Sequence, residues 1–267
     1  MKKILLIAVG TMLLFGCQET KKNTNESDIV SEENTSSDQE TFAQNELFTV
    51  TPISHATMVL KWDGQVLFVD PVGGPAAFQN FDEPDLILIT DIHGDHLNIE
   101  TLEGIVTENT TILAPKAVSD KLPESLQAKT TILNNGDDHA VLGFTVTAIP
   151  MYNLREEALK FHEKGRGNGY VLEKDGKRIY ISGDTEDIPE MRNLENIDIA
   201  FVCMNLPYTM PVASAADAVL EFKPNIVYPY HYRGTDGLSD VDEFAEIIAK
   251  ANADIKVTQL DWYPERE

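Results

Sequence analysis

The sequence has few basic residues for its length, and this shortage excludes one class of partner. Among 267 residues there are 21 lysines and arginines against 44 aspartates and glutamates, and the formal net charge is −23 at pH 7. Because phosphate backbones need a basic surface, the composition argues against nucleic acid as a partner. Such acidity also repels anionic substrates unless a local cation or a metal ion compensates for it.

Cysteine is scarce as well, with only two in the chain. Cys17 ends an apolar N-terminal segment, and Cys203 ends the apolar run 199–203 (IAFVC). If Cys17 carries a lipid, Cys203 is the only thiol left in the mature domain, and no intramolecular disulfide can form there. Its apolar surroundings predict a small core residue rather than a nucleophile.

No apolar run is long enough to span a bilayer. The longest N-terminal one, 4–15, follows Lys2 and Lys3 and is typical of a secretory signal. It ends in the sequence LFGC at 14–17, which resembles a bacterial lipobox. That resemblance implies a signal peptide over 1–16 and a lipid on Cys17, and therefore a bacterial cell-envelope location with the lipid as the membrane contact. The alternative is a signal peptide cut elsewhere, with an incidental cysteine.

Residues 17–46 are predicted to be a flexible acidic tether. After Cys17 the segment is rich in Glu, Asp, Ser, Thr and Asn, and its sizeable apolar side chains are Ile29, Val30 and Phe42. Too little apolar surface is available to offset the entropy of ordering such a chain. The catalytic domain is therefore expected to occupy residues 47–267.

The pattern of this domain predicts an α/β fold. An Asp-Gly dipeptide stands between two apolar runs at 63–64 and again at 175–176, which is typical of a β-hairpin. Asn98 is expected to cap a short helix that includes 100–105. In the last third, strand and helix patterns alternate over 197–202, 213–222, 226–228, 241–251 and 255–259.

The densest group of chemically competent side chains directly follows the apolar strand 86–89. The segment 90–96 (TDIHGDH) contains the four metal-competent residues Asp91, His93, Asp95 and His96. A strand that ends in such a cluster places it at the carboxyl edge of the sheet, where α/β folds carry their sites. The alternative is a solvated acidic loop with two incidental histidines.

This segment resembles the H-x-H-x-D-H motif of the metallo-β-lactamase-fold hydrolases, with Asp91 at the position of the first histidine. Further similarities are found in order along the chain at 69–71 (VDP), 182–185 (SGDT) and 229–232 (PYHY). The segments 161–170 (FHEKGRGNGY) and 205–210 (NLPYTM) resemble the branch that contains ascorbate-6-phosphate lactonase and the N-acyl-phosphatidylethanolamine phospholipase D. The resemblance implies a four-layer αβ/βα sandwich.

The same resemblance implies a site for two divalent metal ions. The ligands that it implies are Asp91, His93 and His162 for one ion, Asp95, His96 and His231 for the other, and Asp184 as a bridge between the two. Zinc is the expected metal. The carboxylate of Asp91, in place of an imidazole, adds a negative charge and a hard oxygen donor, which makes manganese or iron more plausible. Alternatively, Asp91 only forms a hydrogen bond to a neighbouring histidine.

Other side chains are expected to surround these ligands. Asp70, at the end of an apolar strand, is expected to accept a hydrogen bond from a ligand histidine. His55 is expected either to support the ligands or substrate or to be an ordinary buried residue. Lys164 and Arg166, beside His162, are a candidate clamp for an anionic substrate, with a solvated glycine-rich loop as the alternative. Tyr208 is expected to face the substrate or to be an ordinary surface residue.

The sequence therefore predicts a metal-dependent hydrolase. A hydroxide that bridges the two ions would attack a small ester, lactone or phosphodiester, and Asp95 would accept the proton. Two alternatives remain open: a lipid phosphodiesterase, and a lipoprotein that binds a metal or ligand without catalysis. The sequence predicts neither the oligomeric state nor the substrate.

Overall fold

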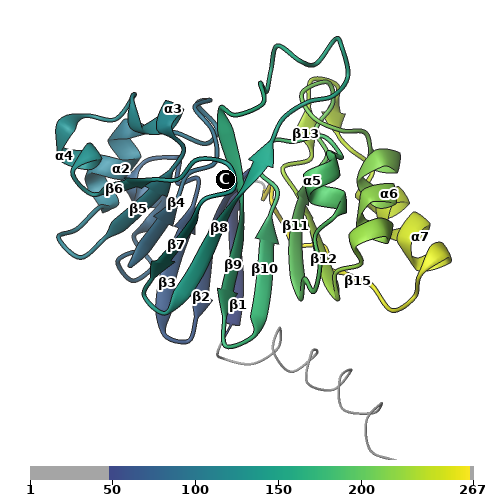
Figure 1. The fold of residues 1–267 in the computed structure, drawn as a ribbon, viewed down its shortest axis with the longest axis horizontal. Helices are drawn as coiled ribbons and strands as arrows, with labels where there is room; N and C mark the ends of the chain where they lie inside the picture. Colours follow the sequence, from purple (N-terminus) through teal and green to yellow (C-terminus); the bar gives the residue numbers. More distant parts are fainter. Residues whose placement is uncertain (1–47, 265–267) are drawn as a thin grey trace, which may run out of the picture.

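The computed structural model describes residues 48–264. The predicted signal peptide, the tether and Cys17 lie outside the described residues. Two sheets face each other, with α2–α4 outside the first and α5–α7 outside the second (Figure 1). This arrangement of helix, sheet, sheet and helix confirms the predicted α/β class.

The first sheet has six strands in sequence order. Its strands are β1 (Phe48–Ser54), β2 (Thr57–Trp62), β3 (Gln65–Val69), β4 (Leu86–Leu88), β5 (Thr111–Ala114) and β6 (Thr130–Ile132). The first three are antiparallel, whereas β3 to β6 are parallel. The carboxyl ends of β3 and β4 therefore meet at one edge of the sheet.

The second sheet has the order β15-β12-β11-β10-β9-β8-β7. Its strands are β7 (Asp138–Val141), β8 (Phe144–Met151), β9 (Gly167–Lys174), β10 (Lys177–Ile181), β11 (Ile199–Cys203), β12 (Ile226–Tyr230) and β15 (Lys256–Val257). Antiparallel strands β7 to β10 are followed by the parallel set β10, β11, β12 and β15. Both sheets thus combine antiparallel hairpins with parallel strands, and β13 (Arg233–Gly234) pairs with β14 (Gly237–Leu238) outside them.

The helices lie on the outer faces of the sheets. They are the 3-10 helix η1 (Pro75–Phe78), α2 (Ile99–Ile105), α3 (Lys116–Ser119), α4 (Glu124–Gln127), α5 (Pro189–Arg192), α6 (Val212–Phe222) and α7 (Val241–Ala251). The Asn98 side chain caps α2 as predicted, by accepting a hydrogen bond from the Thr101 N–H. No helix within residues 48–264 is long and apolar enough to cross a membrane.

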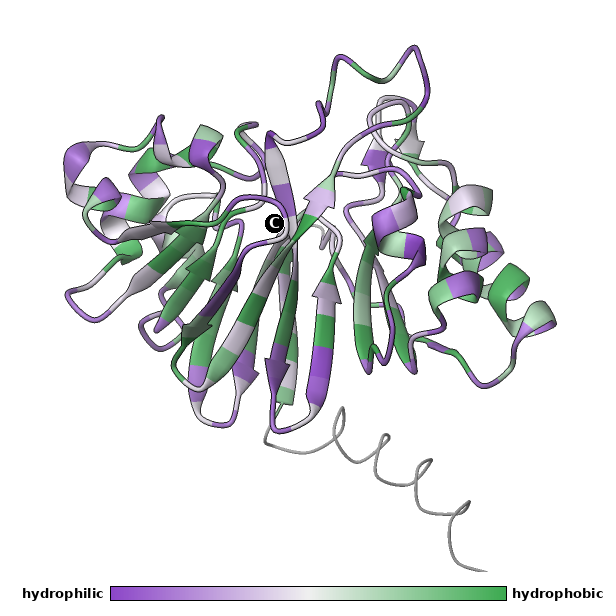
Figure 2. Ribbon diagram, in the orientation of Figure 1, coloured by the Kyte–Doolittle hydropathy of each residue, from purple (hydrophilic) through white to green (hydrophobic). Residues whose placement is uncertain are grey.

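The strands are rich in apolar residues, as their green colour in Figure 2 shows, and the buried apolar side chains form two cores. Leu67 and Leu88 belong to the large core shared by the two sheets, whereas Phe68 and Ile87 belong to a smaller core beneath α2–α4. Both faces of β3 and β4 are thus buried, which explains their continuous apolar runs. Cys203 is a buried core residue, and burial raises the pKa of its thiol to about 12.

Candidate metal centre

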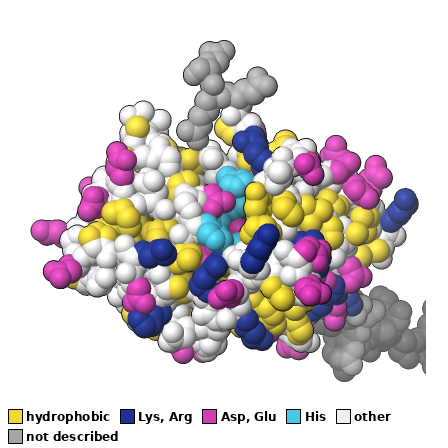
Figure 3. All heavy atoms as spheres, turned by 90° about the horizontal axis from the view of Figure 1, so that it is seen from above, with side chains coloured by type: hydrophobic (Ala, Val, Ile, Leu, Met, Phe, Trp, Pro, Cys, Tyr) yellow, Lys and Arg dark blue, Asp and Glu magenta, His cyan; other side chains and the backbone are white. Residues whose placement is uncertain are grey.

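Polar side chains gather at the sheet edges where several strands end. Asp70 follows β3, the loop 90–96 follows β4, Asp184 follows β10, and His231 follows β12. The chain has six histidines, and five of them belong to the metal-competent groups of residues 48–264. Viewed from above, histidine side chains lie in a hollow bordered by apolar and basic side chains (Figure 3).

The first group, here called the His96 cluster, consists of His96, Asp184 and His231, all buried. His96 Nε2 lies 3.3 Å from Asp184 Oδ2, and His231 Nε2 lies 3.2 Å from Asp184 Oδ1. The two Nε2 atoms are 3.1 Å apart. Asp184 Oδ1 is buried without a hydrogen-bond partner of its own. Buried nitrogen and oxygen donors that converge in this way fit a divalent cation, which would satisfy that oxygen.

Asp70 fixes the orientation of the His96 ring. Its Oδ2 lies 2.8 Å from His96 Nδ1. Thr90 donates to both oxygens of the same carboxylate, from its N–H at 2.7 Å and from its hydroxyl at 2.6 Å. A proton on Nδ1 therefore faces Asp70, and the lone pair of Nε2 is directed toward Asp184. This is the contact that the sequence predicted for Asp70.

The charges in the His96 cluster shift the pKa values of its members. Burial alone would lower the pKa of His96, but the carboxylates of Asp184 and Asp70 raise it well above its ordinary value of 6.5. Burial alone would raise the pKa of Asp184, but His231, His96 and His162 lower it well below 3.8. A proton on His96 would compete with a metal cation for the same lone pair.

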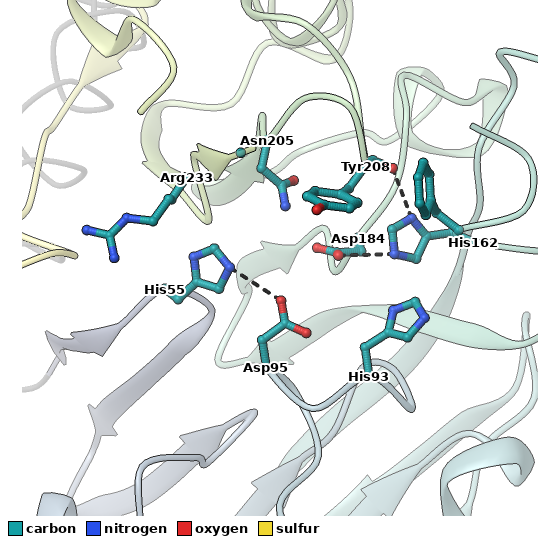
Figure 4. A pocket seen from close by; sticks show the side chains of 10 residues that line it. His55, His93, Asp95, His162, Asp184, Asn205, Tyr208 and Arg233 are labelled. Atoms are coloured by element: carbon teal, nitrogen blue, oxygen red, sulfur yellow. Dashed lines mark hydrogen bonds and ion pairs between the residues drawn. The ribbon is translucent and has the colours of Figure 1, made fainter. Parts of the chain in front are cut away.

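The second group, the Asp91 cluster, consists of Asp91, His93 and His162. Asp91 Oδ2 lies 2.7 Å from His93 Nδ1 and 4.0 Å from His162 Nε2. His162 Nε2 also lies 3.1 Å from Asp184 Oδ2, so that Asp184 stands between the two clusters. The other nitrogen of His162, Nδ1, is 3.1 Å from the backbone carbonyl of Tyr208 (Figure 4).

Arg166 binds the carboxylate of Asp91. Its Nε donates to Asp91 Oδ1 at 3.1 Å and its Nη2 to Oδ2 at 2.9 Å. The same Nη2 donates to the carbonyl of Phe161 at 2.6 Å. Burial alone would raise the pKa of Asp91, but the hydrogen bond from His93 and the charges of His96, His93 and Arg166 lower it. The guanidinium therefore offsets the charge that this carboxylate adds to the site.

Lys164 also has partners other than a substrate. Its Nζ donates to Glu190 Oε1 at 2.8 Å and to the Tyr152 hydroxyl at 3.1 Å, and it lies over the Tyr152 ring. Neither Lys164 nor Arg166 lines the pocket at the metal centre. The clamp that the sequence predicts for Lys164 and Arg166 stays a prediction, and in this structure both side chains are paired with acidic residues.

A third group, the Asp95 cluster, consists of His55, Asp95 and His231. His55 Nε2 and His231 Nε2 lie 3.3 Å and 3.4 Å from the same oxygen, Asp95 Oδ2. The other oxygen, Oδ1, lies 3.8 Å from His96 Nε2. Asp95 therefore links the early loop that carries His55 to the His96 cluster.

A pocket of about 460 Å³ opens above these clusters. Its lining residues are His55, His93, Asp95, Phe161, His162, Asp184, Asn205, Tyr208, Arg233 and Gly234. Tyr208 thus faces the pocket, with its ring against that of Phe161 at a centroid distance of 5.0 Å. Figure 4 places Arg233 across the pocket from His162.

The model of the family described as the beta-lactamase superfamily domain matches residues 49–231 of this chain. The chain belongs to this superfamily.

A UPF0173 metal-dependent hydrolase from Thermococcus onnurineus is 31% identical over 205 residues, which cover 73% of this chain and 90% of that protein. One from Pyrococcus abyssi is 28% identical over 206 residues, with the same coverage. A crystal structure from Parabacteroides distasonis, described as that of a metal-dependent hydrolase, is 37% identical, covers 81% of this chain and 94% of its own, and gives a TM-score of 0.72. The protein shown in Figures 1 to 4 is therefore itself a metal-dependent hydrolase with the metallo-β-lactamase fold.

Sequence reasoning missed three residues at or beside the pocket of this hydrolase. Arg233 stands two positions after His231, and this proximity in the sequence is the only local signal for its place at the pocket. Asn205 begins a segment that resembles the family, but no chemistry was assigned to it. Tyr263 bonds His55 from 208 residues away, and no local pattern announces such a contact.

Proposed function

We propose that this hydrolase holds two divalent metal ions and cleaves a small ester, lactone or phosphodiester. The observation that carries the proposal is the position of Asp184, whose carboxylate lies 3.1 Å from His162 and 3.3 Å from His96. One carboxylate between two sets of imidazoles is suited to bridge two ions. Two bound ions would supply a bridging hydroxide near neutral pH and stabilise negative charge on the substrate.

Asp95 is proposed to accept the proton of the attacking water. Burial alone would raise the pKa of Asp95, but hydrogen bonds from His231 and His55 lower it far below 3.8. Asp95 is therefore ionised at neutral pH, and its carboxylate lines the pocket where a substrate must bind.

Zinc is the proposed metal, with manganese or iron as alternatives. Four imidazoles, from His93, His96, His162 and His231, dominate the proposed ligand set and suit zinc. The hard carboxylate of Asp91 would favour manganese or iron, but Arg166 already offsets its charge. Coordination of the metal by Asp91 stays a prediction, and the alternative is that Asp91 contacts only His93 and Arg166.

Metal analysis and a substrate screen test the proposal directly. Protein purified without added metal is analysed by mass spectrometry of its metals, then assayed with bis(4-nitrophenyl) phosphate, 4-nitrophenyl acetate and a γ-lactone. We expect about two ions per chain and turnover of at least one substrate class. Bound metal with no turnover of any class would instead favour a non-catalytic metal- or ligand-binding protein.

The proposed substrate carries an anionic group, and Arg233 is proposed to bind it. Arg233 lines the pocket, and its guanidinium lies over the Tyr263 ring at 4.1 Å. Within residues 48–264 it forms no ion pair with an acidic residue. In a protein of net charge −23, such a guanidinium at the pocket is suited to an anion.

Arg233→Ala tests this role, with Lys164→Ala as the matched control. We expect kcat/KM for an anionic phosphodiester to fall about tenfold to a hundredfold, as for the loss of one charged hydrogen-bond donor. Turnover of a neutral ester should change much less, and Lys164→Ala should leave the ratio of the two substrates unchanged. Equal losses on both substrates in Arg233→Ala would reject the role.

A lipid phosphodiesterase is the second candidate, and a specific observation favours it. Of the seven exposed large hydrophobic residues within 48–264, five lie in the segments that follow β8, β11 and β12 at the edge carrying the metal centre. They are Leu154, Leu159, Leu206, Tyr208 and Leu238. Exposed apolar groups around a pocket mark a binding surface for apolar ligands or membranes. This candidate agrees with the proposed relationship to the phospholipase branch.

Chain length of the substrate separates the two candidates. A lipid enzyme would prefer a long-chain glycerophosphodiester in vesicles to its short-chain soluble analogue, and replacing Leu154 and Leu159 by Ser would remove the preference. An equal rate on both substrates would favour the small-molecule hydrolase. Leu142→Ser, an exposed leucine in the turn between β7 and β8, is the control.

We also propose that the protein is anchored to a bacterial membrane through a lipid on Cys17. The proposal rests on the resemblance of 14–17 to a lipobox and on the polar composition of 18–46. Cys17→Ser should move the protein from the membrane fraction to the soluble one, or leave the signal peptide uncleaved. An unmodified Cys17 in mature, membrane-bound protein would reject it.

A further inference from the structure

His55 lies where it could be mistaken for an eighth metal ligand. Its Nε2 is 3.3 Å from Asp95 Oδ2, and its ring lies against that of His231 at a centroid distance of 3.8 Å. By distance alone, these three residues could hold a third ion. Which ring nitrogen of His55 carries a proton decides the matter, because a protonated nitrogen has no lone pair to give to a metal.

The Tyr263 hydroxyl determines that proton position. It accepts hydrogen bonds from the backbone N–H groups of Tyr232 and Arg233, both at 2.9 Å. It also lies 2.8 Å from His55 Nδ1. A phenol oxygen has two lone pairs and one hydrogen. Since both lone pairs are taken, the hydrogen must be donated to Nδ1.

A ring that accepts at Nδ1 carries its single proton on Nε2. A doubly protonated ring would direct a third donor at the same phenol oxygen, which has no lone pair left for it. The Nε2–H group then faces Asp95 Oδ2, where it can donate.

Backbone hydrogen bonds hold the main chain of His55 in place. His55 has a positive φ of 58°, and its N–H donates to the Trp262 carbonyl at 3.2 Å. Its own carbonyl accepts from the His231 N–H at 3.3 Å. The main chain of His55 is therefore tied to the C-terminal segment and to a proposed metal ligand, while the ring itself is held by Tyr263 and Asp95.

We infer that His55 is a positioning residue that donates its Nε2–H to Asp95, with Tyr263 fixing the tautomer, and that it is not a metal ligand. The donated hydrogen bond holds Asp95 Oδ2 and leaves Oδ1 directed to the His96 side of the centre. The effect on turnover rests on the proposed role of Asp95 as proton acceptor. The tautomer and the metal count do not depend on that role.

Nitrogen-15 NMR of histidine-labelled full-length protein tests the tautomer, with His55→Gln used to assign the signals. We expect the His55 correlations to show a proton on Nε2 both without metal and after addition of Zn²⁺. Tyr263→Phe should lose this single tautomer. A proton on Nδ1, or a His55 Nε2 signal that becomes that of a metal ligand on addition of Zn²⁺, would overturn the inference.

Two substitutions at His55 distinguish hydrogen-bond donation to Asp95 from coordination of a metal ion. The amide nitrogen of His55→Gln can take the place of Nε2 and donate to Asp95, whereas His55→Ala cannot. We expect both variants to keep the zinc content of the unchanged protein, and only His55→Ala to lose about tenfold or more in kcat on bis(4-nitrophenyl) phosphate. His231→Gln, at a proposed ligand, is the control that should lose zinc.

Zinc loss in both His55 variants would overturn the inference, and so would an equal fall of kcat in the two. If neither the variants nor the unchanged protein turn over any substrate, only the proposed hydrolysis is contradicted. The NMR and zinc measurements would then still decide the role of His55.

Discussion

The two clusters that meet at Asp184 differ in how far the protein satisfies its own polar groups. In the His96 cluster, all three side chains are buried and Asp184 Oδ1 has no hydrogen-bond partner. In the Asp91 cluster, Arg166 and His93 already engage both oxygens of Asp91, and the His93 side chain is 40% exposed. A buried carboxylate oxygen that accepts no hydrogen bond gains more from a cation than one that already accepts them. We therefore expect the His96 cluster to bind metal more tightly.

The largest effect is expected from Asp184→Asn, because Asp184 belongs to both clusters. The amide keeps the shape but removes the charge that lies between His96, His162 and His231. We expect neither ion to stay bound. The affinity for Zn²⁺ should fall by more than the 10- to 100-fold that is typical when a residue hydrogen-bonded to a metal ligand is lost. Equilibrium dialysis with Zn²⁺ measures this. Retention of two tightly bound ions would show that Asp184 is not shared.

The comparison of His96→Ala with His93→Ala tests the difference between the clusters directly. His96→Ala should lose the tightly bound ion and nearly all hydrolysis, whereas His93→Ala should lose only the weaker ion. Stepwise zinc titration followed by calorimetry distinguishes the two. His139→Ala, on strand β7 and in none of the three clusters, should keep both ions. Stoichiometric binding of two ions by His96→Ala would contradict the assignment.

Strand ends were predictable from the sequence because the patterns around them are local. An apolar run followed by a polar cluster located Asp91, His93, Asp95 and His96, and the Asp-Gly turns at 63–64 and 175–176 both adopt positive φ. These signals depend on a few neighbouring residues, which a single sequence shows. Short polar elements were missed, since β7 (Asp138–Val141) has too few apolar residues to indicate a strand.

Contacts between distant segments could not be predicted in the same way. Arg166 looks like a free cation in its glycine-rich segment, yet its partner Asp91 lies 75 residues earlier. Tyr263 looks like an ordinary tyrosine near the end of the chain until the fold brings it to His55. Such pairs are determined by the packing of the two sheets against each other, and neither composition nor residue spacing predicts them.

Arg166→Ala sharpens the comparison at the Asp91 cluster. Removing the guanidinium leaves a buried carboxylate without a cationic partner, so the metal-free protein should lose about 3 kcal/mol of stability. Zinc should restore part of this loss, because a cation next to Asp91 takes over the charge. Chemical denaturation with and without a chelator measures both. An equal loss in the two conditions would mean that Asp91 does not respond to the metal, and Arg233→Ala controls for the loss of an arginine elsewhere at the site.

The smallest expected effect concerns the choice of metal. Asp91→His replaces a hard oxygen donor by an imidazole, and softer nitrogen ligands favour zinc over manganese. Because Arg166 already offsets the charge of Asp91, the change in preference should be modest, about tenfold in the ratio of zinc to manganese affinities. Competition titrations of the two ions measure this ratio. Asp91→Asn is the matched control, since it removes the charge but keeps an oxygen. If neither variant changes the ratio, Asp91 serves only to hold His93 and Arg166, and the second ion has no carboxylate of its own besides Asp184.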